Sequence, residues 1–136
     1  MDIHGISDVV ALAATNTKAA AATTNFTGID ITKYDGGMKL VLDATVGTGT
    51  TPTLDVKIQD SADSTNGTDG AWADLSPAVV FVQVAAAAYA NGVNTQAIGV
   101  QANNVRKWIR AVATVGGSAS PTFTFSVVAS IPRQYV

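Results

Sequence analysis

The chain has 136 residues, which is enough for one domain that buries roughly two thirds of the surface exposed by its unfolded form. Its net charge is −2, and because there is no basic excess to neutralise phosphates, the composition disfavours nucleic-acid binding. The sequence has no cysteine, which excludes disulfides and thiolate chemistry, and no apolar stretch approaches the roughly 20 residues of a membrane-spanning helix.

Charged residues make up only 13% of the chain, whereas about a quarter is usual in soluble domains. Two explanations are open. Either neutral Thr, Ser and Asn side chains cover the surface, or much of the surface is buried against partner molecules.

Residues 1–24 are predicted to form either a first strand or a flexible N-terminal arm, because alanines and threonines in this stretch have conflicting propensities. The β domain is predicted to occupy residues 25–136. Its first strand is expected over residues 25–32, where the residue pattern alternates. Residues 33–37 contain Asp-Gly-Gly, which supplies the positive φ angles that a turn needs.

One hairpin pattern appears twice, at residues 39–58 and 108–127, and Ala44 aligns with Ala113 at a constant offset of 69 residues. In both copies apolar and polar residues alternate on either side of a turn rich in Gly, Ser and Thr. This period of two predicts that one face of each strand is buried. The predicted inward set is Leu40, Leu42, Ala44, Val46, Leu54, Val56 and Ile58, then Ile109, Ala111, Ala113, Val115, Phe123, Phe125 and Val127. We expect a pseudo-symmetric sandwich with one hairpin in each half.

The stretch from Gln59 to Leu75 is the place where oxygen ligands cluster, at Asp60, Asp63, Asn66 and Asp69. A calcium site is therefore a candidate, although the EF-hand spacing and its closing Glu are missing. The same residue types are ordinary turn formers, and a turn is the favoured interpretation.

Further strands are predicted over residues 79–84, 93–100 and 105–115. The first should be buried on both faces or lie in an interface, because it is rich in β-branched residues. On the last strand, Arg106, Trp108 and Arg110 stand two apart on the face opposite the core. They form either a solvated face or a contact surface, for which Trp and Arg are favoured anchors. Tyr135, in the tail after Pro132, is a further interface candidate.

About eight short strands and no convincing helix predict an all-β fold, an antiparallel sandwich or jelly roll. No enzyme and no cofactor are expected. His4 is the single histidine and lies near the N-terminus, Glu is absent, and no Gly-rich phosphate-binding loop precedes a helix.

Two stretches carry a resemblance to a known family. Residues 105–129 have a basic-aromatic entry, a strand that ends in Thr-Val-Gly-Gly, a Ser-Pro turn and a Phe-Thr-Phe-Ser-Val strand. Residues 54–75 have a strand, an Asp-rich turn and Trp-Ala-Asp-Leu. Together they resemble capsid decoration (cement) proteins of tailed bacteriophages, over roughly residues 26–130.

The resemblance implies a structural virion protein, made in the host cytoplasm, that sits on the capsid surface as a homotrimer. Its implied partner is the major capsid protein of an HK97-like shell, and its implied role is to stabilise that shell. Two alternatives stay open: a tail or baseplate β-module, and a carbohydrate-binding sandwich. In the second, sugars would stack on Trp72, Trp108, Tyr34 or Tyr89.

Overall fold

The computed structural model describes residues 7–19, 22–45, 47–85 and 93–133. These residues form nine strands and one short 3-10 turn, η2 (Ala102–Asn104), so the predicted all-β antiparallel fold is confirmed. The strands are β1 (Ser7–Ala19), β2 (Ala22–Asn25), β3 (Ile29–Asp30), β4 (Gly37–Thr45), β5 (Thr48–Ser61), β6 (Ala73–Asp74), β7 (Val84–Ala85), β8 (Val93–Gln101) and β9 (Trp108–Pro132).

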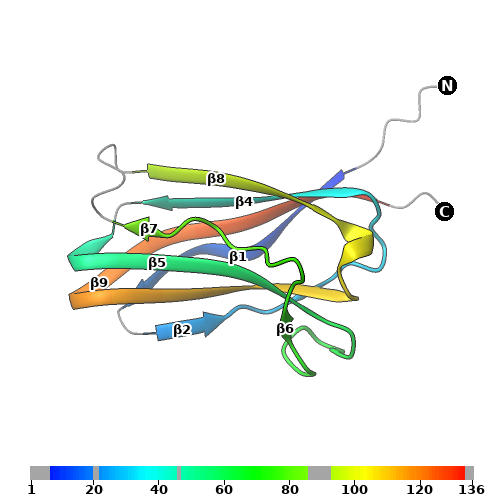
Figure 1. Ribbon diagram of the computed structural model, residues 1–136, viewed down its shortest axis with the longest axis horizontal. Helices are drawn as coiled ribbons and strands as arrows, with labels where there is room; N and C mark the ends of the chain where they lie inside the picture. Colours follow the sequence, from blue (N-terminus) through cyan, green and yellow to red (C-terminus); the bar gives the residue numbers. More distant parts are fainter. Residues whose placement is uncertain (1–6, 20–21, 46, 86–92, 134–136) are drawn as a thin grey trace.

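The longest strand, β9, runs along the molecule, turns at one end and returns (Figure 1). Its first arm, residues 108–116, pairs with β5, and its second arm, residues 122–132, pairs with β4 and β1. Gly117 at the turn has a φ of +118°, a conformation that costs glycine little because it has no Cβ. The two arms of β9 therefore belong to different layers.

The layers are two curled sheets joined through β9 (Figure 1). The first sheet has the order β8–β4–β9 second arm–β1. In the second sheet β5 pairs with the first arm of β9; β6 and β7 lie beyond β5, and β2 and β3 lie beyond β9. Side chains from both sheets fill the space between them.

The internal repeat has a structural counterpart in the strand register. Leu42 of the first copy pairs with Val127 of the second, and Ile58 of the first copy pairs with Ala111 of the second. Adding 69 to 42 gives 111, and subtracting 69 from 127 gives 58, so each pair maps onto the other. The two copies are thus related by an internal pseudo-two-fold.

The prediction of one hairpin in each half of the sandwich was wrong. Among the described residues, the two strands of a copy do not pair with each other: β4 pairs with β8 and β9, and β5 pairs with β6, β7 and β9. Each copy is an arch that places one strand in each sheet. The alternation of buried residues is the same for a hairpin and an arch, so the sequence pattern cannot distinguish the two.

The predicted inward-facing residues form the core. Every one of them that the structure describes is at most 2% exposed. The largest fully buried side chains are those of Phe123, Phe125, Leu40, Leu42, Leu54, Ile58, Ile109 and Ile131. Phe26 packs edge-on against Phe125, with 6.0 Å between ring centroids. Burying side chains of this size stabilises a fold by about 1.5–3 kcal/mol each.

Two predicted strands have different bounds in the structure. The strand expected over residues 25–32 is divided into β2 and β3, because at Gly28 the backbone N–H turns away to donate to the carbonyl oxygen of Gly67 at 2.8 Å. The strand expected to start at residue 105 starts at Trp108, since the backbone N–H of Arg106 donates to the Asp60 side chain, at 2.9 Å, and not to a neighbouring strand.

The stretch predicted as a strand over residues 79–84 runs alongside β5, with an isolated bridge between Val80 and Lys57 and a ladder that starts only at β7 (Figure 1). We call residues 75–83 the bridging segment. It lies between β6 and β7 in the sequence, and Val79 and Phe81 exchange backbone bonds with β5. These two residues are buried, whereas Val80 is 54% and Val82 is 71% exposed. Burial on both faces was therefore wrong, and the interface alternative remains a prediction.

Most of the predicted N-terminal segment, 1–24, is strand. β1 pairs with the second arm of β9, and its first residue, Ser7, lies opposite Pro132. Two register shifts, between Ala11 and Ala13 and between Ala13 and Asn16, interrupt the ladder. The beginning of β1 and the end of β9 therefore lie side by side.

Candidate functional site

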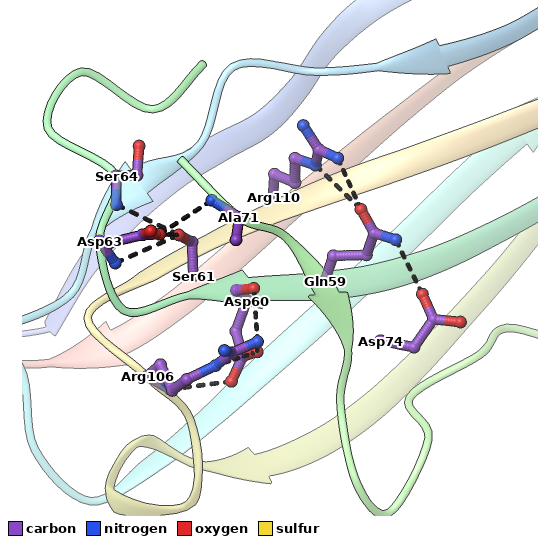
Figure 2. A network of polar contacts seen from close by, with 9 residues as sticks. All are labelled: Gln59, Asp60, Ser61, Asp63, Ser64, Ala71, Asp74, Arg106 and Arg110. Carbon is purple, nitrogen blue, oxygen red and sulfur yellow. Dashed lines mark hydrogen bonds and ion pairs between the residues drawn. The ribbon is translucent and has the colours of Figure 1, made fainter. Parts of the chain in front are cut away.

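The two candidate regions from the sequence, the Arg106–Trp108–Arg110 row and the Asp-rich loop, lie next to each other because β5 and the first arm of β9 are paired. Gln59 lies opposite Arg110, and Ser61 lies opposite Trp108. The loop that follows β5 therefore begins beside the row, as Figure 2 shows.

Arg106 is bound to Asp60, a carboxylate whose residue is only 6% exposed. The Arg106 side-chain Nε donates to Asp60 Oδ1 at 2.7 Å and its backbone N–H donates to Oδ2 at 2.9 Å (Figure 2). Nη2 forms an ion pair with Oδ1 and donates to the Asp60 carbonyl oxygen. This carboxylate holds the pKa of the Arg106 guanidinium above its ordinary value. Asp60, a candidate calcium ligand, instead anchors the chain that enters β9.

Arg110 belongs to a chain of polar contacts over the second sheet. Its Nε and Nη2 donate to Gln59 Oε1 at 3.0 and 2.7 Å, and Gln59 Nε2 donates to Asp74 at 2.8 Å (Figure 2). Asp74 in turn pairs with Lys57 at 2.8 Å. The Arg110 guanidinium also lies over the Trp72 ring, 4.4 Å from its centroid, a favourable cation–π distance.

Trp108 is half-buried between its two arginine neighbours. Its ladder partners are Asp30 on β3 and Ser61 on β5. Within the described residues, its buried Nε1–H has no hydrogen-bond acceptor. Both arginines of the row are thus bound within the chain, and the role of the row as a contact surface stays a prediction.

The Asp-rich loop is organised by its own hydrogen bonds. Asp69 accepts bonds from the hydroxyl groups of Ser64 and Thr65 and from the N–H groups of Thr65 and Asn66. Asn66 Oδ1 accepts from Thr68 and from the N–H of Asp69. These are the side-chain-to-backbone bonds that Asp and Asn make in turns.

Asp63 stabilises the other end of the loop. Its Oδ1 accepts from the Ser61 hydroxyl and from the N–H of Ala71, both at 2.9 Å (Figure 2). These two donors lower the pKa of the Asp63 carboxyl. The N–H of Ala71 has the larger effect, and the Ser61 hydroxyl the smaller one. The Thr65 hydroxyl and N–H and the Ser64 hydroxyl hold the pKa of Asp69 far below its ordinary value. Both side chains are therefore charged acceptors.

The four candidate calcium ligands do not converge. Over the described residues, no three His, Asp, Glu or Cys side chains lie together in a group that could hold a metal ion. Asp60 faces Arg106, while Asp63, Asn66 and Asp69 face donors of the loop itself. The loop has the bonding of a turn.

Trp72 attaches the loop to the sandwich. Its Nε1 donates to the carbonyl oxygen of Asp69 at 2.9 Å, and its ring occupies the space that a Cβ on Gly28 would need. Leu75, three residues further along the chain, is buried, with 7% of its surface exposed. Because Arg110 lies over the Trp72 ring, that face of the ring is covered.

Other predicted residues lie away from this region. Tyr34 is 5% exposed, and its hydroxyl donates to Asp8 at 2.9 Å. Burial and the Asp8 carboxylate raise the pKa of Tyr34. Tyr89 and Tyr135 lie outside the described residues.

The structure also contains polar contacts between distant parts of the chain that the sequence did not predict. Asp8 accepts a bond from Arg133 Nε at 2.8 Å, which ties β1 to the residue after β9, and this pair borders an open groove of about 630 Å³. Gln96 on β8 bonds both the N–H and the carbonyl oxygen of Val82, each at 2.8 Å. These partners are far apart in sequence, and no local pattern predicts them.

Comparisons with known proteins give a fold but no family. No protein-family model and no curated protein matches the chain. Among solved structures, the chain is similar to VP2 of infectious bursal disease virus in a subviral particle, with a TM-score of 0.55 and 11% identity over 97% of this chain. A chain of T=1 particles derived from infectious bursal virus gives a TM-score of 0.54 and 8% identity over 97%.

The chain spans about a third of the length of these viral chains, 33% and 32%. A Bacillus endospore-appendage (pilus) chain gives a TM-score of 0.44 at 17% identity, too low to establish a common fold. The two higher scores show that this chain has a fold found in these viral particle chains. They identify no tailed-phage decoration family, so that resemblance remains an expectation from sequence. The described residues contain no helix that is long and apolar enough to cross a membrane.

Proposed function

We propose that this chain is a structural virion protein. The observation that carries the proposal is the fold: nearly the whole chain aligns with one part of VP2, a protein seen in a subviral particle. A sandwich of this kind can use broad sheet faces and edges for contact with other subunits. The proposed role needs contact surfaces and no catalytic group.

The finer form of the proposal is a decoration protein that binds the outside of an HK97-like shell as a homotrimer. Its support is the sequence resemblance and the composition. With 13% charged residues, the chain has many neutral Thr, Ser and Ala side chains that need no ionic partner when a shell covers them. The proposed partner is the major capsid protein, the proposed location is the capsid surface, and synthesis takes place in the host cytoplasm.

The mechanism would be mass action. A protein that binds the assembled shell and not its dissociated subunits stabilises the shell by about 2.7 kcal/mol per site at a hundredfold excess over Kd. Binding through several copies at once converts weak single contacts into strong attachment.

The test uses shells assembled from the major capsid protein of the phage that carries this sequence, in expanded and unexpanded form. We expect saturable co-sedimentation with expanded shells and a higher shell melting temperature. Purified tails and a glycan array are the matched controls. Binding to tails alone would replace the proposal with a tail or baseplate module. A fluorescence change on glycan titration would favour a sugar-binding module, although Trp72 is covered by Arg110 and Tyr34 is buried.

A further inference from the structure

The bridging segment and β8 form a face without any charged residue. The sequence from Leu75 to Val105 contains no Asp, Glu, Lys, Arg or His. In the structure the described parts of this stretch, residues 75–85 and 93–105, are brought together at one side of the sandwich, where the bridging segment runs between β8 and β5 (Figure 1). Gln96 of β8 holds it there through the backbone of Val82.

This neutral face has an apolar ridge. Val80 and Val82 stand two apart and point outwards, while Val79 and Phe81 point into the core. Apart from Val9 on β1, they are the large hydrophobic side chains that are exposed within the described residues. Exposed apolar side chains mark a binding surface when they are contiguous with further apolar surface, whereas isolated ones are ordinary.

Next to the ridge lies an apolar groove of about 300 Å³. The earlier part of the bridging segment forms one wall, with Pro77 and Ala78, and the end of β8 forms the other, with Ile98 and Val100. A Cβ built on Gly99, in the same wall, meets no atom within 4 Å. The neutral face therefore carries both a projection and a hollow.

Among the described residues, β8 pairs with β4 and its other edge pairs with no strand. Edge strands that stay unpaired usually carry charges, Pro or bulges that prevent pairing with another chain. β8 has nine residues with no charge and no Pro, and its pairing with β4 runs without a register shift. By contrast, the edge strand β1 has Asp8 and two register shifts. An edge like that of β8 is a template for pairing unless it is covered.

We propose that the neutral face, made of the bridging segment and β8, is the surface through which this chain binds a second copy of itself. A ridge beside a groove on one face suits contact between copies, because the ridge of one copy can enter the groove of the next, as the heterologous contacts of a ring such as a trimer require. The bridging segment and β8 themselves contribute no charged side chain to the contact, and Asp43 and Asp55 lie at its borders, where they accept bonds from Thr95 and Gln83. The inference deepens the homo-oligomer in the proposed function by assigning its contact surface.

The test is the solution mass of the full chain by light scattering and sedimentation, over a range of concentrations. Val82→Lys and Val80→Lys place an ammonium group in the contact, and Val9→Lys is the matched control, since Val9 is 74% exposed on β1. We expect the wild type and Val9→Lys to exceed the 13.8 kDa monomer mass. The bridging-segment variants should dissociate with a Kd higher by about tenfold or more.

Circular dichroism and melting curves check that the variants are folded, and Val82→Thr, which keeps the shape and replaces one methyl group with a hydroxyl, provides a milder variant. A monomeric wild type would overturn the inference, as would equal dissociation by Val82→Lys and Val9→Lys. Shell binding separates the two proposals. A wild-type monomer that loses shell binding on Val82→Lys would assign the neutral face to the capsid. An oligomer that never binds shells would keep this inference and end the decoration proposal.

Discussion

At the level of single residues, Gly28 shows how a missing side chain determines where a loop docks. A Cβ there would collide with the Trp72 ring and lie 3.0 Å from the Ile109 carbonyl oxygen. The Gly28 N–H also donates to Gly67. Trp72, the Asp-rich loop and β9 all meet at this position.

We therefore expect Gly28→Ala to destabilise the fold by about 1–3 kcal/mol, because Trp72 must move from its packed position. Gly99→Ala is the matched control: its Cβ enters open space, and the loss of glycine freedom in the unfolded chain should stabilise by up to about 1 kcal/mol. Urea unfolding followed by tryptophan fluorescence measures both changes. Equal effects of the two substitutions would contradict this account of Trp72.

Because of Asp69, the free energy of unfolding should depend on pH in the acid range. Its carboxyl has an ordinary pKa of 3.8, and the Thr65 and Ser64 donors lower that value in the folded chain. A depressed folded pKa adds stability that is fully present above the unfolded pKa and is lost as the pH falls through the folded one. We expect the melting temperature of the wild type to fall below about pH 4.

Asp69→Asn should lower the melting temperature at pH 7 and make its fall below pH 4 shallower, since one linked carboxylate is gone. Asp43→Asn is the control, because that exposed carboxylate accepts a bond from the Thr95 hydroxyl on the neighbouring strand and organises no loop. Calorimetry between pH 7 and pH 2 measures both curves. A pH profile of Asp69→Asn parallel to the wild type would show that the loop is held by other groups.

At the level of elements, the bridging segment is fastened by side-chain bonds where a full strand ladder is absent. Gln96 acts as a substitute strand partner, with its amide donating to and accepting from the Val82 backbone. On the other side, backbone bonds join Val79 and Phe81 to β5 at 3.0 Å. The segment is thus held by few bonds to each sheet.

We expect Gln96→Ala to reduce global stability by about 1–2 kcal/mol and to raise hydrogen exchange at the Val82 amide. Gln83→Ala is the control, because the Gln83 amide bonds Asp55 on β5 and leaves the Val82 backbone untouched. Exchange measured by NMR distinguishes the two variants. Unchanged protection of Val82 in Gln96→Ala would contradict the proposed fastening.

The Asp-rich loop is an element that we expect to be independent of calcium. Its carboxylates already accept bonds from the loop's own N–H and hydroxyl groups, so a metal ion would have to displace them. Adding calcium or a chelator should leave the melting temperature unchanged. If calcium raised the melting temperature and EDTA reversed that rise, the loop would again be a candidate metal site.

At the level of the whole molecule, the two described ends of the chain are neighbours. Ser7 and Pro132 are paired on adjacent strands, and Arg133 bonds Asp8. Chain ends that lie together permit circular permutation, provided that the new ends fall in an exposed turn. Asn103 and Asn104 in η2 are both exposed.

We expect a permutant that starts at Asn104, with the old ends joined by a short Gly-Ser linker, to fold and unfold cooperatively. A permutant cut between Asp55 and Val56 is the control, because it divides β5 within its ladder to β9. Circular dichroism melting compares the two. If both unfold alike, the pairing of β5 with β9 is not essential to the fold.

Much of the fold was predictable because burial follows a period of two along each strand. Leu40, Leu54 and Phe123 were placed inside by alternation alone, and all are buried. The candidate site was less predictable. From the sequence, Asp60 was interpreted as a turn residue or a calcium ligand. Only the pairing of β5 with β9 brings it to Arg106. Val80 and Val82 read as buried residues, since a β-branched run contains no signal for an exposed edge.

By itself, the sequence determined the fold class, the inward faces of the main strands and the internal repeat, because alternation and turn chemistry are local properties of the chain. Only the tertiary structure decided that the repeats are arches and not hairpins. It also decided that the Arg106 row is bound within the chain and that the uncharged stretch forms one face. These outcomes depend on which distant strands become neighbours, and the same alternating pattern satisfies burial in either arrangement.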